Sequence, residues 1–129
     1  SADDPVIVFA NHTCYMRLIV HDFSAIQNVL PFRGNNINIY WIFCATFGKQ
    51  ELVEYKGHWP DFAIKRIVIP PKFLSLSFGK SVEAMFQKIY ANELEMQSLT
   101  NLRDTLLPKL ISGELRIPNA EKLIEEVLT

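Results

Sequence analysis

One stretch of about 30 residues, from Phe78 to Leu107, constrains the fold more than any other part of the chain. It contains no proline and a single glycine, Gly79, and most of its residues favour helix. A helix of this length extends for roughly 45 Å, which is more than a body of about 70 residues can cover. The sequence therefore predicts a long helix whose surface is partly covered by something outside this chain.

Apolar residues repeat with a period of seven along this stretch. A pattern sustained for about four heptads is typical of a coiled-coil helix that packs against a partner helix. Polar residues within such a pattern cost stability but can fix register or partner choice. One row consists of Val82, Ile89, Met96, Arg103 and Leu110, and the other of Met85, Asn92, Leu99 and Leu106.

The end of the helical pattern is marked by proline and glycine. Pro108 enters a leucine-rich stretch at a cost of roughly 3 kcal/mol if it lies in a helix interior, and Ser112 and Gly113 then stop the pattern. Beyond Gly113, Asn119 is expected to cap one short amphipathic helix.

The first part of the chain is predicted to form a small mixed α/β body. Four runs rich in Val, Ile and aromatic residues are predicted strands: PVIVFA, CYMRLIV, AIQNVLPF and FAIKRIVIP. In NIYWIFCATFGKQ, the apolar density, a capping residue at Asn38 and Gly48 at the end favour a buried helix over a strand. The preceding RGNN is a turn. The expected fold class is α+β: a body over residues 1–72, then the long helix and a short C-terminal helix over residues 73–129.

Composition limits the function classes. The formal net charge is -1, so a nucleic-acid-binding surface would have to be a local patch. Cys14 and Cys44 stand in apolar surroundings and are interpreted as reduced core thiols of a cytoplasmic protein. No run reaches the roughly 18 apolar residues that a membrane span needs, and no signal peptide is recognised.

Motifs of catalysis are not found in the sequence. It contains no phosphate-binding glycine loop, no HExxH, no GxSxG and no CxxC pair, and its three histidines are too scattered to suggest a metal site. Asp3, Asp4 and Asp61 could contribute to a minimal nuclease, but no Glu-x-Lys partner follows them, so solvated carboxylates are the favoured interpretation. We expect no catalysis and no metal or cofactor on this chain.

Three polar clusters fall in predicted loops: ANHT, RGNN and KGHWP. Asn and Arg can make bidentate contacts with adenine and guanine edges, and Lys and backbone N–H groups bind phosphates. The alternative is that Asn and Gly only form turns and that Trp59 anchors a loop in the core. On loop position and chemistry, the candidate DNA-binding residues are His12, Arg17, Arg33, Asn35, Asn36, Lys56, His58 and Trp59.

The segment LRDTLLPKLISGEL closely resembles the ending of the specificity subunits of type I restriction-modification enzymes. The resemblance continues backwards through IVIPPKFLSLSFGKSVEAMFQKI, which is similar to the family's transition from a target recognition domain into a conserved spacer helix. It is strong from Ile69 to Leu115 and more diffuse before that. Many members carry an acid-glutamine pair after the double proline, and KFLSLSF stands here instead.

The resemblance implies that the chain holds the distal part of one recognition domain and one spacer helix. In this family each recognition domain reads one half of a bipartite DNA target, and the helical regions dock methyltransferase subunits, through which restriction subunits join. S-adenosylmethionine, ATP and magnesium are expected on partner subunits only. From the heptad pattern and the family motif, the residues assigned to helix packing or subunit docking are Val82, Ile89, Met96, Leu99, Leu102, Arg103, Asp104, Leu106, Leu107, Pro108, Leu110, Gly113 and Glu114.

Two other hypotheses stay open at this point. In the first, the long helix dimerises or binds another chain and the body has no role with nucleic acid, which the near-neutral charge slightly favours. The second is the minimal nuclease. The family-like ending favours the DNA specificity module.

Overall fold

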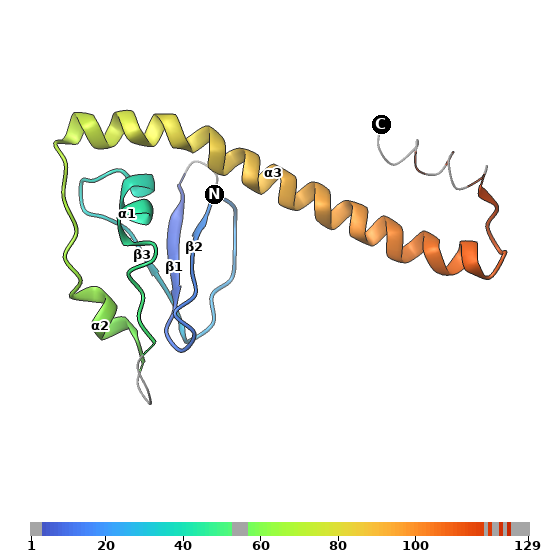
Figure 1. The fold of residues 1–129 in the computed structure, drawn as a ribbon, viewed down its shortest axis with the longest axis horizontal. Helices are drawn as coiled ribbons and strands as arrows, with labels where there is room; N and C mark the ends of the chain where they lie inside the picture. Colours follow the sequence, from blue (N-terminus) through green and yellow to red (C-terminus); the bar gives the residue numbers. More distant parts are fainter. Residues whose placement is uncertain (1–3, 53–56, 118, 120–121, 123, 125–129) are drawn as a thin grey trace. The chain divides into compact units, whose positions relative to one another are not determined.

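The computed structural model describes residues 4–52, 57–117, 119, 122 and 124. Its elements are β1 (Val6–Ala10), β2 (Met16–Ile19), β3 (Val29–Phe32), α1 (Ile39–Thr46), α2 (Trp59–Ala63) and α3 (Lys72–Ile111) (Figure 1). A small sheet with short helices followed by one long helix confirms the predicted α+β class. The chain forms two compact units, residues 1–87 and residues 88–129.

The sheet has three antiparallel strands in the order β2-β1-β3. The central strand β1 carries the most buried side chains of the sheet, with Ile7 and Phe9 both fully buried. Pro31 lies in β3, where the missing N–H is tolerated because β3 is an edge strand. The strands predicted in residues 5–10 and 14–20 are confirmed. Of the strand predicted in residues 25–32, only the last four residues form a strand, β3.

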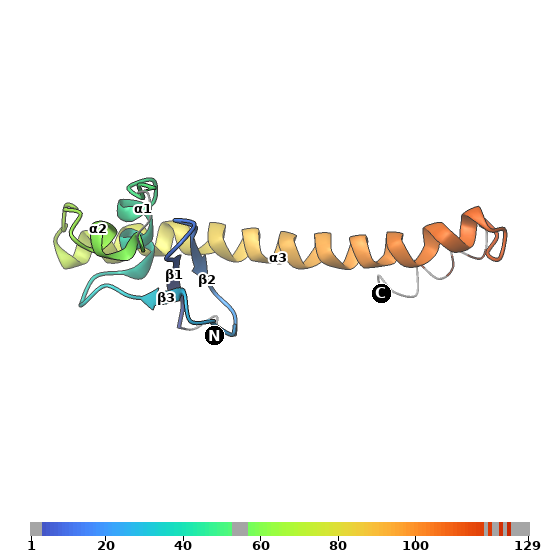
Figure 2. The same cartoon turned by 90° about the horizontal axis from the view of Figure 1, so that it is seen from below.

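Aromatic packing holds one face of the sheet. The ring of Phe9 stacks on Phe62 of α2 with centroids 4.7 Å apart, and Trp59 contacts both Phe9 and Phe32 at 5.6 and 5.3 Å. Such pairs contribute about 0.5–1.5 kcal/mol each beyond the burial of their area. Figure 2 shows α1 and α2 on the same side of the sheet. This face is the core of the body.

The helix predicted for the segment after RGNN is confirmed as α1. The side chain of Asn38 accepts a hydrogen bond from the backbone N–H of Tyr40 at 3.0 Å and so caps the helix, as expected. Gly48 follows the helix with a φ of +82°, a conformation that glycine adopts without strain. Both signals in the sequence therefore mark the ends of α1.

The strand predicted in residues 62–70 is wrong. Phe62 and Ala63 end α2, and residues 65–70 run without a strand partner in the described part of the chain. The side chains of Ile64 and Val68 are 77% and 78% exposed. Alternating Val and Ile favour extended backbone, but a strand also needs a neighbouring strand to bond with.

The assignment of both cysteines to the core is corrected by the structure. Cys44 is exposed on α1, because the apolar helix buries other residues against the sheet. Cys14 is half-buried, has a φ of 54°, and donates from Sγ to the carbonyl of Glu51 at 3.3 Å. The two thiols are not joined in a disulfide.

Helix α3 is longer at both ends than the predicted range of about 78–107. It begins directly after the Pro70-Pro71 pair and runs for 40 residues, or about 60 Å. One side of its first turns packs on the body: Phe78 contacts Trp41 at 5.2 Å, and Ser75 is fully buried. Among the described residues, no helix combines the length and apolarity that crossing a membrane requires.

The end of α3 matches the proline and glycine signals. Pro108 is accommodated in the last turn, and Gly113 has a φ of +75°. Its N–H donates to the carbonyl of Leu110 at 3.2 Å, and the N–H of Leu115 donates to Lys109 at 3.0 Å, which satisfies carbonyls at the helix terminus.

The short C-terminal helix lies mostly outside the described residues. Ile117, Asn119, Lys122 and Ile124 are described and are helical. Because Ile117 is already helical, Asn119 does not cap this segment as predicted.

Candidate nucleic-acid interface and docking helix

The sheet register separates the predicted DNA-binding residues into two groups. Ala10 pairs with Val29, and Ile7 pairs with Phe32. The turn after β1 and the loop after β3 therefore lie at opposite ends of β1, about 13 Å apart along the strand. We call these places the Asn11 end, with residues 11–13 and 57–59, and the Arg33 end, with Asp4 and residues 33–37.

At the Asn11 end, the polar residues mostly hold the structure together. The carbonyl of Asn11 accepts from the N–H of His58 at 2.9 Å, and its side-chain oxygen accepts from the N–H of Trp59 at 2.9 Å. His58 is only 5% exposed, and Trp59 belongs to the aromatic core. His12 is exposed, and Lys56 lies outside the described residues. The contacts of Trp59 with aromatic core residues agree with the alternative interpretation, in which Trp59 anchors its loop in the core.

At the Arg33 end, polar side chains are exposed. The guanidinium of Arg33 donates from Nη1 to the Asp4 carboxylate and from Nη2 to the Asp4 carbonyl at 3.1 Å. Asn35 and Asn36 are exposed, and Asn36 has a φ of 57°, which asparagine tolerates better than most residues. Arg33, Asn35 and Asn36 therefore stand together in one exposed loop.

The hydrogen bond from Arg33 lowers the pKa of the Asp4 carboxyl below its ordinary value, and the positive charge of Arg33 acts in the same direction. The carboxylate in turn neutralises part of the charge of Arg33. This ion pair is well exposed, with side-chain exposures of 46% for Arg33 and 65% for Asp4, so solvent screens it strongly.

Arg17 lies in β2 and not in the loop that precedes it. It pairs with Val8 of β1. The side chain of Val8 points to the opposite face of the sheet from those of its neighbours Ile7 and Phe9. The half-buried Arg17 side chain is therefore on the face of the sheet opposite to α1 and α2.

The predicted docking residues on α3 and beyond differ in exposure. Leu106 is buried, at 8% exposed, and Val82, Leu102 and Leu110 are half-buried. Among the predicted docking residues in the second unit, four large apolar side chains remain about half exposed or more, and we call them the apolar stripe: Ile89, Met96, Leu99 and Leu107. Exposed with them are the remaining predicted residues Arg103, Asp104, Pro108, Gly113 and Glu114.

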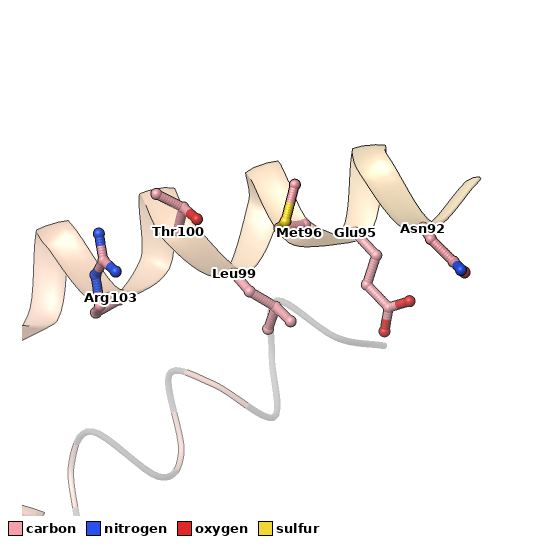
Figure 3. A pocket seen from close by; sticks show the side chains of 6 residues that line it. All are labelled: Asn92, Glu95, Met96, Leu99, Thr100 and Arg103. Atoms are coloured by element: carbon pink, nitrogen blue, oxygen red, sulfur yellow. The ribbon is translucent and has the colours of Figure 1, made fainter. Parts of the chain in front are cut away.

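An open hollow of about 350 Å³ lies along this part of α3 (Figure 3). Spacings of three and four residues bring Asn92, Met96, Leu99 and Arg103 onto one side of the helix. Arg103 also donates from Nε to the neighbouring Asp104 carboxylate at 2.8 Å. The hollow therefore combines apolar surface with two polar heptad positions, and it is lined by Asn92, Glu95, Met96, Leu99, Thr100 and Arg103.

The carboxylates of the nuclease hypothesis do not form a cluster in the described structure. Asp4 is paired with Arg33, Asp61 lies in the first turn of α2, and Asp3 lies outside the described residues. Within the described part of the chain, no three His, Cys, Asp or Glu side chains come together in a way that could hold a metal ion.

Two positioning residues were not singled out from the sequence. Asn11 bonds to two successive residues of a segment 47 and 48 positions later, and no local pattern announces such a pairing. Gly79 packs directly against Asn38. The sequence offered a sign of this contact, because Gly79 is the single glycine of the long helical stretch and glycine is disfavoured in helices.

Comparison with known proteins identifies two relatives. Over 112 aligned residues the chain is 31% identical to the specificity subunit of the type I restriction enzyme MjaIX from Methanocaldococcus jannaschii, covering 79% of this chain. Over 54 residues it is 39% identical to the specificity subunit of the type I restriction enzyme HindI from Haemophilus influenzae, covering 42% of this chain. No protein-family model matches the chain, and no solved structure matches it significantly.

Both relatives are specificity subunits of restriction enzymes, and the chain is related to this class of protein. More particularly, both are subunits of type I enzymes, which confirms the resemblance predicted from the sequence. The aligned region spans about a quarter of the first relative, 26%, and 12% of the second. The chain thus corresponds to a segment of such subunits.

Replacing Arg33 with glutamine should return the pKa of the Asp4 carboxyl toward its ordinary value, because the charged donor is lost. A carbon-detected NMR titration of Asp4 measures this change. Because the pKa is lowered in the folded state, the pair's contribution to stability is present above the ordinary aspartate pKa and is lost as pH falls through the lowered value. Lys49→Gln, an exposed charge after α1, is the control. An unchanged titration of Asp4 in Arg33→Gln would show that the pair does not form.

Proposed function

We propose that this chain is the part of a type I specificity subunit that reads one half of a bipartite DNA target and docks methyltransferase subunits. The observation that carries the DNA-reading part is the Arg33 end. There, three exposed side chains with base-reading chemistry stand in one loop on a packed scaffold. The relationship to two specificity subunits supports the same function.

The side chains of the Arg33 end suit base recognition in the major groove. An asparagine amide can bond to both N6 and N7 of adenine, and an arginine can bond to O6 and N7 of guanine. Both Nη groups of Arg33 donate to Asp4, so a bidentate contact with guanine would replace part of this exposed, solvent-screened pair. Each good bidentate pair contributes about 1–3 kcal/mol of discrimination against a wrong base.

Affinity for DNA would come from local positive charge, since the chain carries a formal net charge of -1. Lys49, Arg66 and Lys72 are exposed in the body or at its junction with α3 and are available for phosphates. Contacts with phosphates release counterions that were bound to the DNA. The free energy gained from this release falls as the salt concentration of the solution rises, so binding weakens. Sequence discrimination would then rest on the loop and not on overall charge.

The docking part of the proposal rests on the apolar stripe. Ile89 and Met96 are 52% and 64% exposed, and burying them against another helix or subunit would remove apolar surface from water. Methyltransferase subunits are the proposed partners, with restriction subunits joining through them. Those subunits would carry S-adenosylmethionine, ATP and magnesium, and this chain would contribute no catalytic group.

A second candidate function is an interaction module that dimerises through α3 without reading DNA. The same apolar stripe favours it, because a second copy of the helix could cover the stripe as well as a methyltransferase subunit could. The two functions differ in whether the body determines a DNA sequence.

An exchange of segments tests the DNA-reading function. The chain, assembled with its methyltransferase subunit, is offered a pool of randomised DNA duplexes, and the bound sequences are read. Replacing residues 5–87 with the matching segment of the Methanocaldococcus relative should change the selected half-site. The exchange ends at residue 87 because Phe86 packs on Tyr40 and Phe43 of α1. Exchanging residues 88–117 is the control and should leave the selected bases unchanged. An unchanged half-site in the first chimera would show that the body is not the reader.

Charge placed in the apolar stripe tests docking. Leu99→Asp should weaken association with the methyltransferase subunit by at least about tenfold, because the carboxylate would have to be buried at the interface. Analytical ultracentrifugation measures this association and also self-association.

Leu94→Asp is the matched control. Leu94 is 47% exposed and Leu99 is 48% exposed on the same helix, but they point about 140° apart. Leu94→Asp should assemble normally. Equal behaviour of the two variants would contradict docking through the stripe.

A further inference from the structure

Gly79 is the one glycine of α3, and the side chain of Asn38 from the body occupies the space where a Cβ would lie. A Cβ built on Gly79 would lie within 3.0 Å of Nδ2, Cγ and Oδ1 of Asn38, which is closer than real Cβ atoms approach such neighbours. Gly79 is buried. Both residues belong to the first compact unit. Asn38 therefore contacts the helix so closely that no other residue type fits at position 79 without displacement.

The same Asn38 side chain has a second role in α1. Its Oδ1 accepts from the backbone N–H of Tyr40, and its backbone carbonyl accepts from Ile42 at 3.1 Å. Asn38 also follows directly after the loop of residues 33–37. One side chain therefore connects α3, the first turn of α1 and the end of the loop that we assign to DNA reading.

The other part of that loop is held by a second glycine. A Cβ on Gly34 would lie 2.5 Å from Cγ1 and 2.9 Å from Cδ1 of Ile42, so Gly34 packs directly on α1. Between these two contacts, Asn36 adopts a positive φ of 57°. The loop is thus fixed near both ends, while Asn35 and Asn36 remain exposed.

Aromatic residues on both sides of Gly79 along α3 also pack against α1. Trp41 meets Phe78 edge to face at 5.2 Å, and Tyr40 meets Phe86 at 5.3 Å. Burial, together with the charge of Glu83 on α3, raises the pKa of the Tyr40 hydroxyl. In Figure 1, α1 lies beside the first turns of α3.

We propose that Gly79 and Asn38 are positioning residues that set the place of the DNA-reading loop, residues 33–37, against α3. Neither residue needs to touch DNA for this effect. This inference rests on the proposed function, because it names the residues that position the reading loop. It makes base selectivity depend on a glycine of the helix.

A glycine kept only by chance would behave differently. In an ordinary helix position, alanine is favoured over glycine, so Gly79→Ala would leave the loop unchanged and would raise the melting temperature. If Asn38 must move to admit the new methyl group, the loop loses its anchor and the melting temperature falls.

The test uses the full chain and a cycle of variants. Gly79→Ala, Asn38→Gly and the double variant are compared with Ser81→Ala, an exposed position on the same helix. Glycine is accepted at a helix N-cap, so Asn38→Gly removes the side chain with little loss of capping. Amide hydrogen exchange of residues 34–37 is measured first. Selection from randomised duplexes with the methyltransferase subunit follows, at equal concentrations of folded protein.

Gly79→Ala should speed exchange in residues 34–37 by at least about fivefold, the lower limit expected for an overpacked contact, and should broaden the selected half-site. Asn38→Gly should also speed exchange, because it removes the same anchor. Adding Gly79→Ala to Asn38→Gly should change little more, because the methyl group at position 79 then has room. Ser81→Ala should change neither measurement.

Unchanged exchange in Gly79→Ala, or a double variant whose effect is the sum of the two single effects, would overturn the inference while leaving the DNA-reading function intact. Faster exchange with an unchanged half-site would overturn the positioning role in DNA reading. If the unmodified chain selected no sequence at all, the proposed function itself would fail, whatever the exchange rates.

Discussion

The packing of α1 on the first turns of α3 is the interaction on which the rest of the structure depends. Asn38 contacts Gly79 without an intervening side chain, and Phe86 contacts both Tyr40 and Phe43. Because α1 also packs on the sheet, these contacts make the beginning of the long helix part of the core of the body. A change at the packed surface of the helix up to residue 87 can therefore reach the loop before α1.

The sequence was informative where local chemistry determines the backbone. Asn38 and Gly48 marked the ends of α1, and Gly113 marked the end of the long helix. It misled in residues 62–70, where Val and Ile alternate but no strand of the described structure lies alongside. It also underestimated α3, which begins at Lys72, directly after the Pro70-Pro71 pair. Of residues 72–77 only Ser75 is buried, so packing on the body accounts for little of this extension.

The candidate site was predicted as a list of residues and not as a surface. Polar loop residues such as His12 and Asn35 could be named from composition, but only the register of β1 with β3 shows that they lie at opposite ends of the sheet. Burial then divides their roles: His58 and Trp59 support the core, whereas Asn35 and Asn36 face solvent. The family-like ending, in contrast, was readable directly, because leucine spacing, proline and glycine are local signals.

The most direct test of the account is to map which residues touch DNA in the assembled complex. Duplexes carrying photoreactive bases in the selected half-site are crosslinked to the complex, and the modified peptides are identified by mass spectrometry. The account predicts that crosslinks from this chain concentrate in residues 33–37. Crosslinks confined to residues 11–13 and 57–59, or to α3, would contradict it.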